Sequence, residues 1–61
     1  MSNLTSKELS ALEDQIGMEK NLVKKYQVMA DMCSDTTIKG SLNDIANKHQ
    51  QHYTSLMTFL Q

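Results

Sequence analysis

The sequence has one cysteine, no proline, no tryptophan and no arginine. The lone Cys33 excludes an internal disulfide. The six basic residues are scattered lysines and the net charge is -1, so the dense basic patch of a nucleic-acid-binding domain is missing. No run approaches the roughly 18 apolar residues of a membrane span, and no secretory signal is visible. We therefore expect a cytoplasmic protein with neither nucleic acid nor membrane as its partner.

A chain of 61 residues has room for one small domain, which we expect to span residues 1–61. A domain of this size buries only roughly 60% of its unfolded surface and usually depends on disulfides, a metal or a partner subunit. Because disulfides are excluded, a metal or a partner remains. No stretch alternates with period two, and apolar residues recur every three or four positions, so the predicted fold class is all-α.

Two helices are predicted, over about residues 6–33 and 36–60, with a turn at 34–37. Each contains a stripe with alternating spacings of three and four, as in a helix that buries one face. The stripes are Leu9, Leu12, Ile16, Glu19, Val23, Tyr26, Ala30 and Cys33 in the first helix, and Ile38, Leu42, Ile45, His49, His52, Leu56 and Phe59 in the second. Because the turn is short, the helices should lie antiparallel as a hairpin.

The helix starts carry capping signals. Thr5 is followed three residues later by Glu8, the pattern of a capping box at the start of the first helix. Asp35 is the expected N-cap of the second helix, with Ser34 as the alternative. Gly17 lies inside the first helix, either as a surface glycine or as a residue that leaves room for a ligand or a close helix approach.

The apolar surface of each helix is wider than one helix pair can cover. Further apolar residues flank the two stripes: Met18, Leu22, Met29 and Met32 in the first helix, and Ala46, Tyr53, Met57 and Leu60 in the second. So wide an arc favours a four-helix bundle, and a two-fold homodimer of hairpins is the simplest way to build one. Pairing with a different helical protein is the alternative.

Three polar residues interrupt the apolar stripes: Glu19, His49 and His52. Glu19 and His52 are equally far from the turn, and His49 and His52 share a helix face, so all three can converge at one height. Carboxylate and imidazole groups suit transition metals such as iron, zinc and manganese. The three residues are therefore candidate metal ligands, but two alternatives stay open. They can form a hydrogen-bonded polar layer that fixes register without a metal, or His52 can face water.

Two segments of the chain, residues 9–26 and 45–53, resemble the spore coat F family of spore-forming bacteria. The first ends in Met18-Glu19-Lys20-Asn21-Leu22-Val23-Lys24-Lys25-Tyr26, the second contains His49-Gln50-Gln51-His52, and the similarity covers nearly the whole chain. It implies a ferritin-like helical bundle in the spore coat, with other coat-like helical proteins as further partners. In a comparison with the ferritin-like pattern, Glu19 matches the glutamate of the first helix. His52 matches the histidine of the Glu-x-x-His motif, and His49 replaces the glutamate of that motif.

Together these features predict a small structural or assembly protein of the spore-coat type. The alternative is a ferritin-like metal-binding protein with its site in the bundle core. No phosphate-binding loop, nucleophile elbow or Cys-x-x-Cys motif is present, so catalysis is not expected and no catalytic residue is assigned.

Overall fold

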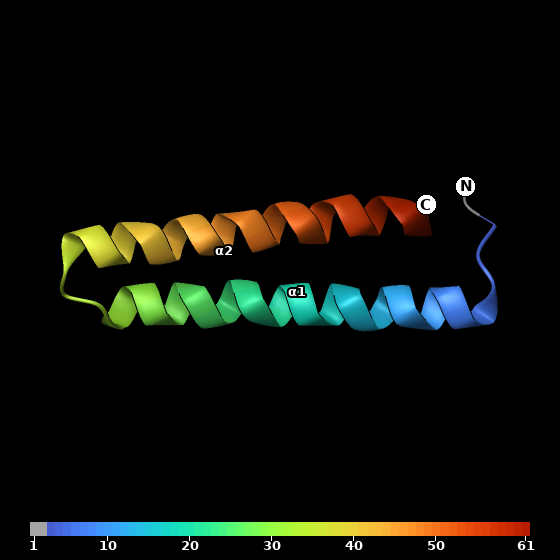
Figure 1. The fold of residues 1–61 in the computed structure, drawn as a ribbon, viewed down its shortest axis with the longest axis horizontal. Coiled ribbons are helices and arrows are strands. Elements are labelled where there is room, and N and C mark those ends of the chain that lie inside the picture. The colour runs from blue at the N-terminus through green and yellow to red at the C-terminus, as the bar shows by residue number, and fades with distance from the viewer. Residues whose placement is uncertain (1–2) are drawn as a thin grey trace.

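The computed structural model describes residues 3–61, so residues 1 and 2 of the predicted domain lie outside the described part. Helix α1 spans Ser6–Met32, α2 spans Thr36–Met57, and a short 3₁₀ helix, η1, continues α2 over Thr58–Leu60. The two long helices lie side by side in opposite directions, with the start of α1 and the C-terminus at the same end of the rod (Figure 1). The described chain is an all-helical hairpin of 46 × 15 × 11 Å, as predicted.

Both helices begin at the predicted N-caps. The Thr5 hydroxyl accepts a hydrogen bond from the Glu8 backbone N–H at 3.1 Å, and the Glu8 carboxylate accepts one from the Thr5 N–H at 3.0 Å. This reciprocal capping box satisfies two donors at the start of α1. The Asp35 carboxylate accepts from the Ile38 N–H at 2.9 Å and so caps α2.

Both helices end slightly earlier than predicted. α1 stops at Met32 because Cys33 adopts an extended backbone, with φ -89° and ψ 127°. Regular α-helix in α2 stops at Met57 and tightens into η1, where the Thr58 hydroxyl donates to the Ser55 carbonyl at 2.6 Å. A 3₁₀ turn of this kind is a common way for an α-helix to end.

The face that α2 packs against α1 is rotated relative to the prediction. On α1 the predicted stripe is buried or half-buried from Leu12 to Cys33, and only Leu9 is exposed. The buried and half-buried residues of α2 are Leu42, Ala46, His49, Tyr53, Leu56 and Met57. Ala46 was expected at the flank but is buried, and its small side chain allows close approach of the helices.

The rotation leaves the other half of the predicted α2 stripe exposed. We call this set, spaced every seven residues, the outer stripe: Ile38, Ile45, His52 and Phe59. Its three apolar members are 53%, 36% and 50% exposed. A strict seven-residue repeat is the pattern of a helix that packs along a seam with another helix, yet α1 does not cover it.

The hairpin has little core of its own. Within residues 3–61, Ala30 and Ala46 are the buried apolar residues, and no large side chain is fully buried. The accessible surface is 4765 Å², whereas a compact monomer of 6.9 kDa would expose about 4000 Å². Neither α1 nor α2 has an uninterrupted apolar stretch long enough to cross a bilayer.

Gly17 is a surface glycine, because a Cβ added there meets nothing within 4 Å. We expect Gly17→Ala to stabilise the hairpin by about 1 kcal/mol, since alanine restricts the unfolded chain and favours helix. Urea unfolding followed by circular dichroism, at one fixed protein concentration, measures the change. Lower stability would instead show that another chain packs closely against this position.

Candidate metal centre

Glu19 is the one buried charged residue among residues 3–61, with 7% of its surface exposed. It lies near the middle of α1, between Ile16 and Val23 on the face that packs against α2. A carboxylate removed from water is costly unless other groups hydrogen bond to it. The structure supplies such groups from both helices.

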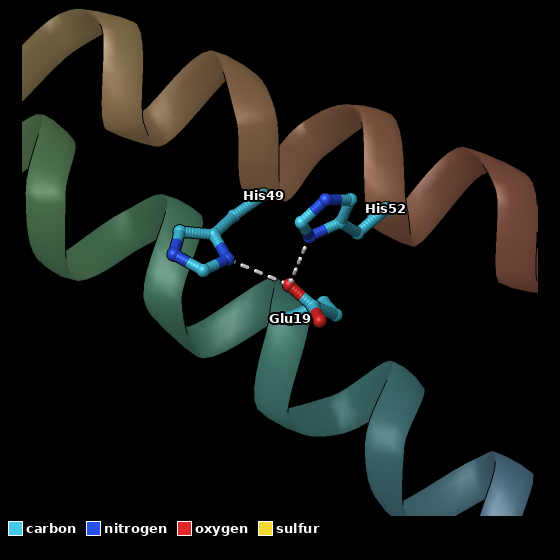
Figure 2. A group of neighbouring side chains, drawn as sticks. All are labelled: Glu19, His49 and His52. Atoms are coloured by element: carbon cyan, nitrogen blue, oxygen red, sulfur yellow. Dashed lines mark hydrogen bonds and ion pairs between the residues drawn. The ribbon is translucent and has the colours of Figure 1, made fainter.

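Two histidines of α2 point at the same oxygen of Glu19 (Figure 2). The His49 Nδ1 lies 2.7 Å from Glu19 Oε1, and the His52 Nδ1 lies 3.5 Å from it. On the other oxygen, Oε2, Glu19 accepts a hydrogen bond from the Gln15 amide at 3.0 Å. Among the described residues no buried side-chain nitrogen or oxygen is left without a hydrogen-bond partner.

Hydrogen bonding keeps Glu19 ionised. The bond from His49 lowers the pKa of the Glu19 carboxyl most strongly, burial opposes that shift, and Gln15 and the nearby charge of the histidines lower the pKa further. An ionised carboxylate is an acceptor only, so His49 Nδ1–H donates to Glu19. Glu19 therefore offers a full negative charge and free lone pairs in the seam.

Aromatic contacts fix the His49 ring. Tyr26 stacks on it with ring centroids 5.8 Å apart and planes 14° apart. The His52 ring meets it edge-on, at 5.7 Å and 85°. The stacked Tyr26 ring supports the imidazole in the orientation that brings Nδ1 to Glu19.

The structure brings all three predicted ligands together. One ligand atom from each of Glu19, His49 and His52 lies within 4.8 Å of the other two. Around a tetrahedral zinc ion with bonds near 2.1 Å, neighbouring ligand atoms are about 3.4 Å apart. The Glu19–His52 separation of 3.5 Å already fits, and the Glu19–His49 hydrogen bond needs to lengthen by about 0.7 Å as the ion replaces its proton. Occupancy by a metal stays a prediction.

The site is closed on one side and open on the other. The Glu19 and His49 side chains are 10% and 22% exposed, whereas the His52 side chain is 59% exposed. The alternative of a water-facing His52 therefore holds for its ring, while its Nδ1 is directed at Glu19. Since His52 belongs to the outer stripe, the open side of the site lies on the exposed apolar face.

Gln15 is the site residue that the sequence analysis missed. It stands one helical turn before Glu19, at the i, i+4 spacing that places two side chains side by side on a helix. That spacing could have indicated the contact. Glutamine is common on exposed helix faces, however, so the signal was weak without knowledge that Glu19 is buried.

The two sides of the hairpin differ in character. A groove between the helices is lined mainly by polar and charged residues, together with Val23 and Tyr53. The polar and charged residues are Lys20, Asn21, Lys24, Gln27 and Gln50. Met18 and Lys20 flank Glu19 on opposite sides of α1, and His52 and Gln50 likewise lie on opposite flanks of the packed face of α2. Because Lys20 and Gln50 share the groove, Met18 and His52 share the other side, which is the apolar one.

Comparison with known proteins gives one informative relative. No family model and no solved structure matches the chain, so the resemblance to the spore coat F family stays a prediction. The chain is 30% identical over 60 residues to the uncharacterized protein YuzM of Bacillus subtilis (strain 168). The aligned region covers 98% of this chain and 74% of that protein. The chain described here therefore belongs to the same family as YuzM.

Proposed function

We propose that this protein is a small structural module that pairs with a second copy of itself to form a four-helix bundle of the ferritin-like type. The bundle is a building unit of a spore-coat-like layer, alone or with other coat-like helical proteins. The similarity of residues 9–26 and 45–53 to the spore coat F family supports the layer, and the exposed outer stripe supports the bundle.

The outer stripe is the observation that carries this proposal. Three apolar side chains of this stripe are exposed, Ile38 and Ile45 on α2 and Phe59 on η1. Met18 and Met29 are 56% and 41% exposed on α1. The hairpin also exposes about 800 Å² more than a compact monomer of its mass. That excess is close to what one partner buries in an interface of standard size, about 800 Å².

A second copy suits this face because a two-fold interface is self-complementary. An apolar stripe on one chain meets the same apolar stripe on the other, and the lysines of the groove stay in water on the far side. Two hairpins brought together in this way supply the four helices of a bundle. The resulting core would contain the large side chains that the single hairpin leaves exposed.

We expect Ile38→Lys to weaken the dimer by at least about tenfold, because a lysine in the seam must lose its water or hold the helices apart. Sedimentation equilibrium of the wild-type chain, whose monomer is 6.9 kDa, gives the reference dissociation constant. Val28→Lys is the matched control: Val28 is 49% exposed, similar to the 53% of Ile38, but faces away from α2. A wild-type monomer at millimolar concentration, or equal weakening by both substitutions, would contradict the proposal.

A second candidate function, metal binding, is favoured by the convergence of Glu19, His49 and His52 on a buried carboxylate oxygen. Such a site would hold a transition metal in the bundle core, with iron, zinc and manganese as the candidates. Elemental analysis of untagged protein purified without chelator tests this function. A stoichiometric metal that is lost in His52→Ala would support it.

A further inference from the structure

We infer that metal binding and pairing are one linked event: Glu19, His49 and His52 hold one divalent transition-metal ion per chain, and a second copy docked on the outer stripe closes the site. The inference rests on the proposed homodimer and makes the metal ion a regulator of how tightly that dimer forms. Its geometric basis is that the open side of the site and the exposed apolar face are the same side of the hairpin.

Each chain by itself offers an incomplete site. Three ligand atoms converge, whereas structural zinc is almost always held by four. The side chain of His52 is 59% exposed, so water has free access to the remaining coordination position. Holding so exposed a side chain in one rotamer costs conformational entropy, and that cost reduces the affinity for a ligand.

Pairing without metal carries a cost at His52. The residue lies in the outer stripe between Ile45 and Phe59, so a partner that covers these two also covers the imidazole. Its Nδ1 makes a long contact of 3.5 Å with Glu19 Oε1, and burying an imidazole that is paired so weakly is unfavourable. An ion bound at Nδ1 satisfies that atom and neutralises part of the buried charge of Glu19. Metal therefore lowers the cost of burying His52, and the dimer tightens.

Linkage requires the converse effect. If saturating both chains with metal tightens the dimer by some factor, dimerisation tightens metal binding at each of the two sites by the square root of that factor. The structural reason is that a second hairpin on the outer stripe shields the site from water and holds His52 in place. Coupling between two sites is typically 5- to 150-fold, and we expect zinc to lower the dimer dissociation constant by at least about tenfold.

Sedimentation equilibrium of the full-length chain, first freed of metal by chelator and then saturated with zinc chloride, tests the inference. Equilibrium dialysis on the same samples gives zinc bound per chain. We expect about one zinc per chain, a dimer in both conditions, and a dissociation constant at least about tenfold lower with zinc. His52→Ala and Glu19→Gln should keep the metal-free dimer and lose both zinc and the tightening.

Two controls remove other sources of zinc-dependent association. Gln51→Ala changes the exposed neighbour of His52 and should respond to zinc as the wild type does. Cys33→Ser removes the single thiol, a competing zinc ligand, and should also keep the response. Glu19→Gln has a further purpose, because zinc that merely bridges exposed histidines of two molecules would not need the buried carboxylate.

The possible failures are distinguishable. A dimer that neither binds zinc nor changes with it overturns this inference and leaves the proposed bundle intact. A monomer in both conditions overturns the bundle and the inference with it. Zinc-dependent association that survives in Glu19→Gln overturns the inference, since the ion is then held at the surface outside this site.

Discussion

Replacing Glu19 with leucine is expected to abolish stabilisation by zinc while leaving the metal-free hairpin as stable as the wild type, or more stable. Glu19 is the buried charge of the described chain, and it lies between the half-buried Ile16 and Val23 on the face of α1 that packs against α2. Exchanging a whole buried ionic cluster for hydrophobic residues is often neutral or stabilising, whereas removing one partner is costly when it leaves another buried charge without a partner. The histidines left behind can hydrogen bond to water, since their side chains are 22% and 59% exposed.

The zinc response provides the large effect. A ligand present at 100 times its dissociation constant stabilises a folded protein by roughly 2.7 kcal/mol, which raises Tm in a domain of this size by roughly 10 °C or more. We expect such a rise in the wild type and none in Glu19→Leu. Thermal unfolding by circular dichroism, at one protein concentration with either chelator or zinc, measures the Tm of the metal-free chain and its rise with zinc for each variant.

Glu13→Leu is the matched control for this substitution. It makes the same chemical change at an exposed position of α1 and should keep the full zinc response. A zinc response retained in Glu19→Leu would show that Glu19 is not a ligand. A metal-free Glu19→Leu chain that no longer folds would show that the contacts from Glu19 to His49 and His52 hold the helices together.

Ala30→Asp is expected to unfold the hairpin at 25 °C. Ala30 is fully buried near the end of α1, where the helices meet. An aspartate there places a carboxylate in the seam. The one buried polar residue among residues 3–61 is Glu19, itself a carboxylate, so it cannot compensate the new charge. The effective penalty for such a buried ion is several kcal/mol. A domain of this length has a total stability of only roughly 3–9 kcal/mol, so most of the helical signal at 222 nm should be lost.

The control is Ala11→Asp, the same substitution at an exposed position of the same helix. It should change the free energy of unfolding by less than about 1 kcal/mol, because surface substitutions rarely do more. Urea titrations of the two variants, compared with the wild type, give both values. If Ala30→Asp folds with near wild-type stability, the close contact of the helices at this position is not a source of stability.

Short-range sequence signals predicted where both helices begin and which residues of the two helices lie at the same height. Thr5 with Glu8 marks the start of α1, and Asp35 marks the start of α2, because a capping side chain and its target N–H are near neighbours in sequence. The convergence of Glu19 with His49 and His52 also followed from sequence, because a short turn fixes which residues of two antiparallel helices share a height. These features depend on spacing alone.

The rotation of α2 could not be predicted in this way. Its stripe has two possible centres, since spacings of three and four describe a band wider than one helix contact. The small side chain of Ala46 selects one of them, and with that choice His49 is half-buried and His52 is on the outer stripe. Such a selection is a property of side-chain packing between two helices, which a pattern along one helix does not contain.

The position of Cys33 gives the rod a natural marker for its direction. It is the C-cap of α1, in the turn between the two long helices, and it is the single thiol in the sequence. That turn lies at the opposite end of the rod from the start of α1 and the C-terminus (Figure 1). In a pair of hairpins running in the same direction, two thiol-linked dyes would sit close together and transfer excitation energy efficiently. In a head-to-tail pair they would be separated by up to the 46 Å length of the rod. The relative direction of the two hairpins in a pair, parallel or antiparallel, can thus be determined by fluorescence energy transfer without any change to the sequence.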